Sequence, residues 1–519
     1  MRAAPMNASG RVAASRSAVC AGVRAPLRSQ TLHPQRASGA SPRAGRSRST
    51  PSAALGAAGA AAAAPAQATG LRGLYPAAAA VHTGTLRVDE LHTLYYEVHG
   101  NPDGAPALFL HGGPGAGCFA NHARFFDPAH YKIVLLDQRG CGRSTPRAAL
   151  RANATSDLVS DVEALRAHLG VAAWAVVLGG SWGAALALAY AQAHPDAARA
   201  LVLRGVCHMT PREVAWVYAP PESGGGAAAA RPEQYAAFAG ALPPRERGNP
   251  LLGYYRRLLS GEAATREAAA RAWMSWEMAV FAGAQQSGQP PQGQDPQAPP
   301  LVERRRPGRA WEARPQLEWP HPPLPPPRGA TEAAAAPPPP AAPLCRRRGA
   351  ALPAEALAGG LEGLLPDCPP DCPPDSPRPW EWGLPGQGAN LWDPEVRSLL
   401  LQGLGHEGGA PETGSSAQAL LTCHFSIHGA FLLDAPLLSP SALAPLRARG
   451  VRCVAVQGGA DLVTPAAAAF DLADAWPEAE VAVVAGAGHS MYNPHITHEL
   501  VCATDRLRAA APAPAPAHA

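Results

Sequence analysis

The sequence predicts an α/β protein in which helices cover both faces of a mostly parallel β-sheet and a helical cap is inserted between strands. Short apolar runs alternate with helical patterns in the first half of the chain, and this alternation is typical of parallel sheets buried on both faces. A helical stretch interrupts it, and strand-like runs ending in glycine-rich turns resume near the C-terminus. The predicted parts are a leader (1–70), the first part of the α/β core (71–209), the cap (210–284), a proline-rich, disordered insert (285–416), the end of the cap with the second part of the core (417–509), and a disordered tail (510–519).

The leader is rich in arginine, serine and alanine, and no aspartate or glutamate precedes Asp89. Lys132 is the only lysine of the chain, so coding bias explains part of the arginine excess, but it would not remove every acidic residue. This composition is typical of an organellar transit peptide. We expect a chloroplast protein, with the mitochondrion or the cytoplasm as alternatives. A plain disordered tail is the simpler explanation.

The first part of the core is predicted from its apolar pattern. Thr85–Val88 and Leu94–Val98 alternate like the two strands of a hairpin. Over Ser156–Leu169, apolar residues recur at the spacing of one helix face. Buried strands are predicted at Ala107–Leu110, Tyr131–Leu136, Trp174–Leu178 and Ala200–Leu203.

The cap and the insert differ sharply in composition. Residues 285–400 hold 28 of the 58 prolines, so this stretch cannot bury enough apolar surface to order itself. A short helix is expected near its end, at Trp392–Leu404. An intron translated by mistake is the alternative explanation of the stretch. The cap helices are predicted at Glu213–Tyr218, Pro232–Ala239, Pro250–Leu259 and Thr265–Phe281.

A glycine-rich turn at Gly179–Gly183 separates the strand Trp174–Leu178 from a helical run rich in alanine and leucine. A G-x-S-x-G sequence in this context forms a sharp turn that exposes its serine, and its glycines let strand and helix approach closely. Ser181 is therefore the predicted nucleophile, at a helix N-terminus that favours developing negative charge. An ordinary Gly-Ser loop is the simpler explanation.

A serine nucleophile needs a base, and the base needs an acid that orients it. Asp461 follows the predicted strand Val451–Val456, and His489 follows the predicted strand Val481–Ala485. Ser181, Asp461 and His489 thus all follow strands, at the sheet edge where open α/β sheets form their sites. Their order along the chain is that of the α/β-hydrolase fold. His489 would take the proton from Ser181, and Asp461 would hold the imidazole.

The oxyanion formed in such a reaction needs hydrogen-bond donors. One is expected to be the backbone N–H of Trp182, and the other to come from the glycine-rich loop that begins at His111. Pro114 has no N–H, which leaves Gly112 or Gly113, and we favour Gly113. The glycines that follow His111 indicate that this histidine shapes the loop rather than transferring protons.

Six motifs together resemble the proline iminopeptidases, which are prolyl aminopeptidases of the α/β-hydrolase fold in peptidase family S33. The resemblance covers roughly residues 73–284 and 417–508. It implies a serine aminopeptidase that releases an N-terminal proline from a peptide through an acyl-enzyme. The motifs are HGGPG at His111–Gly115, DQRGCGRS at Asp137–Ser144, GGSWG at Gly179–Gly183, LRG at Leu203–Gly205, WMSWE at Trp273–Glu277 and GAGHS at Gly486–Ser490.

The resemblance also implies how a substrate is held. Glu277 matches the cap carboxylate that receives the free amine of the substrate in this family. Arg204 and Phe425 match further substrate-binding positions. We expect no metal or cofactor: Cys368 and Cys372 are spaced like half of a metal site, but no nearby histidine pair or second cysteine pair completes it.

The chain departs from the family within this pocket. Thr422 stands where the family has a second glutamate, and Ser426 stands where it has an aromatic residue. Cys207 replaces a further aromatic residue. The lost carboxylate predicts weaker recognition of the amine, and the lost aromatics predict a looser proline pocket.

Charge and hydropathy argue against two classes of partner. Without the nine arginines of residues 1–70, the formal net charge of +4 becomes −5, which leaves no electrostatic footprint for nucleic acid. No apolar run reaches the ~20 residues that span a bilayer. We expect small peptides with an N-terminal proline as substrates. An esterase or a broader-specificity aminopeptidase is one alternative, and a non-catalytic hydrolase-fold binding protein is another.

Overall fold

The structure is a computed structural model, and the residues that it describes are 70–286, 302–308, 394–408, 414–433 and 436–509. They all belong to one unit of the chain, Ala68–Ala519. The predicted tail (510–519) and the predicted leader apart from Gly70 lie outside the described residues. Most of the predicted insert does so too.

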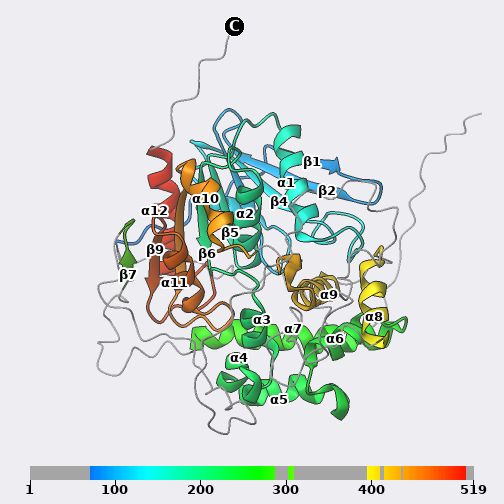
Figure 1. Cartoon of the computed structure of the whole chain (residues 1–519). Coiled ribbons are helices and arrows are strands. Elements are labelled where there is room, and N and C mark those ends of the chain that lie inside the picture. Colours follow the sequence, from blue (N-terminus) through cyan, green and yellow to red (C-terminus); the bar gives the residue numbers. More distant parts are fainter. Residues whose placement is uncertain (1–69, 287–301, 309–393, 409–413, 434–435, 510–519) are drawn as a thin grey trace, which may run out of the picture. The chain divides into compact units, whose positions relative to one another are not determined.

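A nine-stranded sheet runs through the described residues in the order β1-β2-β4-β3-β5-β6-β8-β9-β7 (Figure 1). β1 pairs antiparallel with β2, as predicted for a hairpin, and β2 pairs antiparallel with β4. The pairs between β4 and β9 are parallel, and β7 pairs antiparallel with β9. The prediction of a mostly parallel sheet is therefore confirmed. The strands are β1 (His82–Arg87), β2 (Thr93–Gly100), β3 (Ala105–Leu110), β4 (Tyr131–Asp137), β5 (Val176–Gly180), β6 (Ala200–Arg204), β7 (Val302–Arg305), β8 (Arg452–Gly458) and β9 (Glu480–Val484).

Alternate residues of the central strands face two separate cores. In β3, Leu108 and Leu110 belong to the larger apolar cluster, whereas Phe109 between them belongs to the smaller one. Because helices cover both faces, every residue of β5 and β6 is buried, as expected for strands of a parallel sheet. The larger cluster includes α1 (Thr155–His168), α2 (Trp182–Ala193), α10 (Pro440–Ala448) and α11 (Ala466–Ala475), and the smaller one includes α12 (Pro494–Ala509).

The cap begins at a sequence signal for a helix N-terminus. The hydroxyl oxygen of Thr210 accepts from the N–H of Glu213 at 3.3 Å, and the Glu213 carboxylate accepts from the N–H of Thr210 at 2.8 Å. This reciprocal pair satisfies two N–H groups at the helix start. Pro211 follows at the first helical position, where its missing N–H costs nothing. The cap helices are α3 (Pro211–Tyr218), α4 (Gly226–Ala230), α5 (Pro232–Gly240), α6 (Pro250–Leu258) and α7 (Ala263–Gln286).

Two helices near the end of the predicted insert join the cap. α9 (Gly414–Ile427) packs against α6 and α7, and α8 (Pro394–Leu404) lies beside α6 (Figure 1). α8 reaches α6 through Gln402, whose side-chain amide donates to the carbonyl oxygen of Leu259 at 3.3 Å. The chain therefore returns to the cap before it resumes the sheet at β8.

Two elements form within the predicted insert: α8 is the helix expected there, whereas β7 departs from the predicted disorder. α8 forms within it, near the helix expected at Trp392–Leu404. β7 also forms within it, and Arg304 of this strand donates to both carboxylate oxygens of the buried Glu499 at 2.5 and 2.6 Å. The physical reason is local. The free edge of β9 offers backbone hydrogen bonds to a short strand. The prediction of disorder rests on the average composition of more than a hundred residues, and a strand of four residues hardly changes that average.

The longest described helix is α7, which spans 24 residues. It carries Arg266, Glu267 and Arg271 along its length. Among the helices that the structure describes, none is both long and apolar enough to cross a membrane.

Candidate active site

The predicted nucleophile lies in a sharp turn between β5 and α2. β5 ends at Gly180, two residues later than predicted, and α2 begins at Trp182, so Ser181 alone makes the turn. Its backbone has φ 57° and ψ −126°, a combination that residues other than glycine rarely adopt. A Cβ at Gly179 would lie 2.0 Å from the carbonyl oxygen of Gly183, so the turn requires a glycine there.

The strain of this turn is concentrated on a half-buried serine. A non-glycine residue in such a conformation costs about 1–3 kcal/mol and persists only where its surroundings impose it. Here the N–H of Ser181 donates to the carbonyl oxygen of Arg204 on β6 at 2.7 Å, and the carbonyl oxygen of Ser181 accepts from Ala184 at 2.7 Å. The backbone of Ser181 is thus held on both sides.

The predicted base and acid form a pair. The Nδ1 of His489 lies 2.7 Å from the Oδ2 of Asp461. The other oxygen of Asp461 accepts from the N–H groups of Val463 at 2.8 Å and Thr464 at 3.0 Å. Because both side chains are buried, this contact fixes the imidazole with its proton on Nδ1, and Nε2 remains to accept a proton.

Burial and charge set the protonation of this pair. Burial alone would raise the pKa of Asp461, but the His489 imidazole and the hydrogen bond from the Thr464 N–H keep that pKa below its ordinary value. Burial lowers the pKa of His489, and Asp461 opposes this only in part. A neutral His489 beside an ionised Asp461 is the state that can accept a proton from a hydroxyl.

Arg204 connects the two halves of the site. Its carbonyl oxygen accepts from Ser181, and its guanidinium NH1 donates to the carbonyl oxygen of His489 at 2.9 Å.

The strands that precede Ser181, Asp461 and His489 are near neighbours in the sheet, in the order β5-β6-β8-β9, so their carboxyl ends meet at one edge. Within the part of the chain that the structure describes, no hydrogen bond joins the Ser181 hydroxyl to His489. Such contacts are often long in ligand-free enzymes.

The glycine-rich loop lies directly beside Ser181, the predicted nucleophile. A Cβ at Gly112 would lie 3.2 Å from the Cβ of Ser181. Gly113 has φ 116°, a backbone conformation in which any residue with a side chain would be strained. His111 is buried, and its Nδ1 lies 2.8 Å from the carbonyl oxygen of Gly112. Burial lowers the pKa of His111, so its contacts are those of a neutral residue that shapes the loop.

Glu277 lies on α7, and one of its carboxylate oxygens accepts two hydrogen bonds. The hydroxyl of Tyr218 and the indole N–H of Trp273 donate to its Oε1 at 2.8 and 2.9 Å. Burial raises the pKa of Glu277 to about 7, although these two hydrogen bonds lower it. The carboxylate therefore changes charge near neutrality.

The remaining predicted pocket residues are buried. The ring of Phe425 packs against that of Trp182, with centroids 4.9 Å apart. Thr422 donates its hydroxyl hydrogen to the carbonyl oxygen of Pro114 at 2.9 Å. Cys207 is buried as a free thiol. Two of these residues thus contact parts of the proposed oxyanion site.

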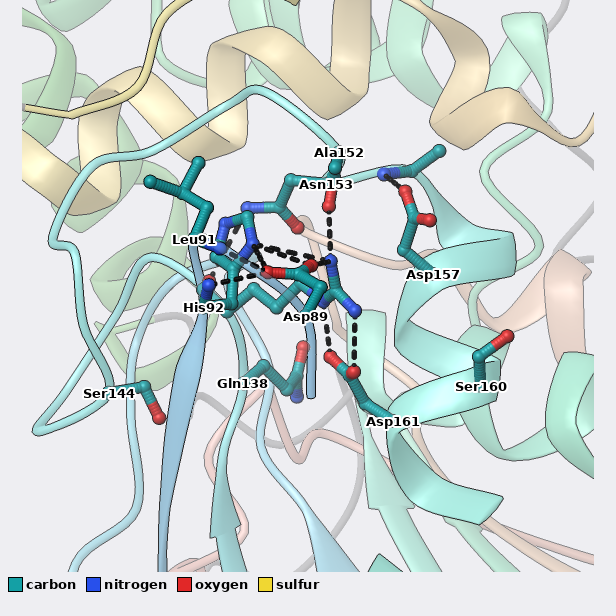
Figure 2. A network of polar contacts seen from close by, with 12 residues as sticks. Asp89, Leu91, His92, Gln138, Ser144, Ala152, Asn153, Asp157, Ser160 and Asp161 are labelled. Carbon is teal, nitrogen blue, oxygen red and sulfur yellow. Dashed lines mark hydrogen bonds and ion pairs between the residues drawn. The ribbon is translucent and has the colours of Figure 1, made fainter. Parts of the chain in front are cut away.

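The motif Asp137–Ser144 builds the support beneath the site, a role that the sequence analysis did not assign. Arg139 donates to both oxygens of Asp161 at 2.5 and 2.7 Å and to Asp89 at 2.6 Å. Figure 2 shows Asp89 and Asp161 within this network of polar contacts. It also donates to the carbonyl oxygen of Ala152 at 2.6 Å. A buried arginine with this many acceptors holds the loop after β4 in one position. The signal available in the sequence was an arginine followed by two glycines directly after a buried strand.

Comparison with known proteins agrees with this architecture. Residues 106–289 match a family model described as the alpha/beta hydrolase fold. The sheet, the strained turn after β5 and this match define the chain as a protein of the α/β-hydrolase fold, as predicted.

Within that class, the matched relatives are proline iminopeptidases, which confirms the predicted resemblance. A proline iminopeptidase of Arabidopsis thaliana is 50% identical over 208 residues, which are 40% of this chain and 53% of the relative. That of Xanthomonas citri is 50% identical over 210 residues, 40% of this chain and 65% of the relative. A probable proline iminopeptidase of Leptolyngbya boryana is 48% identical over 207 residues, 40% of this chain and 63% of the relative. The chain thus matches between about half and two thirds of the length of these curated relatives.

Solved structures align more loosely. The proline iminopeptidase of Mycobacterium smegmatis aligns with 83% of this chain and 99% of its own, at 15% identity and a TM-score of 0.38. The esterase RhEst1 of a Rhodococcus species aligns with 82% of this chain and 97% of its own, at 15% identity and a TM-score of 0.36. These values carry no argument about activity.

Proposed function

We propose that this protein is a serine aminopeptidase that releases an N-terminal proline from small peptides. The observation that carries the proposal is the His489–Asp461 pair, 2.7 Å apart, at the same sheet edge as the strained Ser181. The sequence similarity to proline iminopeptidases supports the choice of substrate.

The proposed reaction proceeds through an acyl-enzyme. The Ser181 oxygen attacks the carbonyl carbon of the N-terminal proline while the Nε2 of His489 takes the hydroxyl proton. The bond to the leaving amine then breaks, and His489 returns its proton to that nitrogen. A water molecule then attacks the acyl-enzyme in the same way, with His489 as the base, and releases proline. The N–H groups of Trp182 and Gly113 are the proposed donors to the oxyanion, and Asp461 stabilises the imidazolium.

Glu277 is the proposed partner of the substrate's protonated imino group. A half-buried carboxylate attracts a cation more strongly than an exposed one, because water screens the pair less. Its Oε1 is already held by Tyr218 and Trp273, which leaves Oε2 for the substrate. Arg204 and Phe425 would act on the substrate through His489 and Trp182, which they contact.

Active-site labelling tests the proposal. A fluorophosphonate probe should label the wild-type protein and leave Ser181→Ala unlabelled, and the wild type should release naphthylamine from proline naphthylamide. Absent labelling of the folded wild type, or equal labelling of Ser181→Ala, would show that Ser181 is not a nucleophile. The protein would then be a non-catalytic binding protein of this fold.

An esterase or a broader-specificity aminopeptidase is the second candidate, and one contact favours it. Thr422 stands at the position of the family's second carboxylate. Its hydroxyl donates to the carbonyl oxygen of Pro114, and it brings no charge to the pocket. A panel of aminoacyl naphthylamides and short esters separates the candidates. Turnover of esters without turnover of proline amides would select the second candidate.

Import into a chloroplast is the proposed fate of the chain, on the composition of residues 1–70. Fusion of these residues to a fluorescent protein in a plant cell tests it. Fluorescence in chloroplasts supports the proposal, whereas fluorescence in mitochondria or in the cytosol overturns it.

A further inference from the structure

The side chain of Gln138 connects the two segments that carry the proposed oxyanion donors. Its Oε1 accepts from the indole N–H of Trp182 at 2.9 Å, and its Nε2 donates to the carbonyl oxygen of His111 at 2.9 Å. All three residues are buried, with exposed fractions of 4% for Gln138 and 1% for each of the other two. One amide therefore joins the start of α2 to the glycine-rich loop.

The two partners leave the amide only one orientation. An indole N–H can only donate, and a backbone carbonyl can only accept. The oxygen of Gln138 must therefore face Trp182, and its nitrogen must face His111. A methionine of similar length has no hydrogen to donate to His111, and its sulfur is only a weak acceptor for Trp182.

The bond to His111 fixes more than one atom. The carbonyl of His111 and the N–H of Gly112 belong to the same rigid peptide plane, so a donor held on that oxygen also sets the direction of the Gly112 N–H. The next plane carries the N–H of Gly113, and its carbonyl oxygen lies 2.8 Å from the His111 Nδ1. The backbone N–H of Gln138 also donates to the His111 Nε2 at 3.1 Å, so Gln138 holds this residue at its ring as well as at its carbonyl.

We propose that Gln138 is a positioning residue that holds the donors of the loop and the donor of Trp182 at a fixed distance and direction from each other. This inference rests on the proposed serine-hydrolase function. It adds a residue that touches neither substrate nor the reacting atoms. Donors of this kind act only if they meet the oxyanion where charge develops.

The effect is expected on the chemical step. A misplacement of about 1 Å at a reacting centre can cost ~100-fold in rate. For Gln138→Met we expect kcat to fall about 10- to 100-fold, while KM changes less than threefold, because the oxyanion donors act on the transition state rather than on the bound substrate.

Gln138→Glu gives a second, pH-dependent readout. A protonated glutamate can accept from Trp182 and donate to His111, whereas an ionised one would face the carbonyl oxygen of His111 with no hydrogen to donate. The ratio of variant to wild-type kcat should therefore be near one at acidic pH and fall as pH rises. A residue with only a packing role would give a ratio independent of pH.

Gln192→Met is the matched control. Gln192 lies on α2, the same helix as Trp182, and its amide donates to the carbonyl oxygen of Leu437 at 2.7 Å, away from the loop. This variant loses an amide of the same kind, and its kcat should equal that of the wild type.

The experiment measures kcat and KM of the full chain and its variants on the best substrate of the naphthylamide and ester panel, with thermal unfolding as the check on folding. A wild-type kcat in Gln138→Met, or a flat ratio for Gln138→Glu, overturns the inference. If Gln138→Met does not fold, the pH profile of Gln138→Glu decides alone. An inactive, unlabelled wild type would instead mean that the proposed function has failed.

Discussion

Thr422 donates its hydroxyl hydrogen to the carbonyl oxygen of Pro114 across 2.9 Å, and 308 positions separate the two residues in the chain. The helix α9 therefore supports the loop beside Ser181. Leu421, the preceding residue, packs on the same loop, since a Cβ at Gly115 would lie 3.0 Å from its side chain.

Thr422→Val should destabilise the protein by ~1–3 kcal/mol, because it leaves a buried carbonyl oxygen without its donor while keeping the shape of the side chain. Urea unfolding measures this change. Thr422→Ser keeps the hydroxyl and is the control. Equal stability of the valine variant and the wild type would mean that the contact contributes nothing.

The KM for proline naphthylamide should fall as pH rises through about 7, because Glu277 ionises in this range and only its charged form attracts the substrate cation. Glu277→Gln should raise KM and remove this pH dependence. An ester substrate without an amine gives the baseline, since its KM should not follow the charge of Glu277. A KM for the proline substrate that stays constant between pH 6 and pH 8 would exclude the role of Glu277.

Arg204→Met should move the acidic limb of kcat/KM to higher pH. Activity falls at low pH because a protonated His489 cannot accept a proton, and the positive charge of Arg204 is one of the causes that lower the pKa of His489. Removal of that charge makes the imidazolium easier to form. Arg204→Lys retains the charge and should shift the limb less, so an equal shift in both variants would point to lost packing instead.

Ser181→Gly should be more stable than Ser181→Ala by ~1 kcal/mol, because glycine adopts a positive φ without the cost that a Cβ brings. Both variants lack the hydroxyl, so the comparison isolates the backbone. Chemical unfolding with a single probe measures the difference. Equal stabilities would mean that the turn stores no strain at φ 57°.

The sheet, and the positions of Ser181, Asp461 and His489 after its strands, could be predicted because each depends on local pattern. An apolar run followed by Gly-Gly-Ser-Trp-Gly specifies strand, turn and helix within a few residues, and the structure forms all three there. Asp461 and His489 follow strands in the same way, and parallel neighbours bring strand ends together without further information.

The contacts of Thr422 and Gln138 could not be predicted, because they join segments that are distant in the chain. A pattern within one segment contains no information on which carbonyl in another segment a hydroxyl or amide will meet. The sequence marks Thr422 only as a departure from a family pattern, and only the packing of α9 against the loop brings it to its partner Pro114. β7 was missed for a related reason, since its partner β9 lies far along the sequence.

The pairing of β7 with β9 has a consequence for any shorter version of this chain. A transcript that omitted residues 285–400 would remove Val302–Arg305 and leave the backbone of β9 unpaired along one side. Unpaired strands of this kind recruit other strands, including those of identical molecules. Such a product would retain Ser181, Asp461 and His489 but gain a tendency to self-associate, and it would also leave Glu499 buried without Arg304.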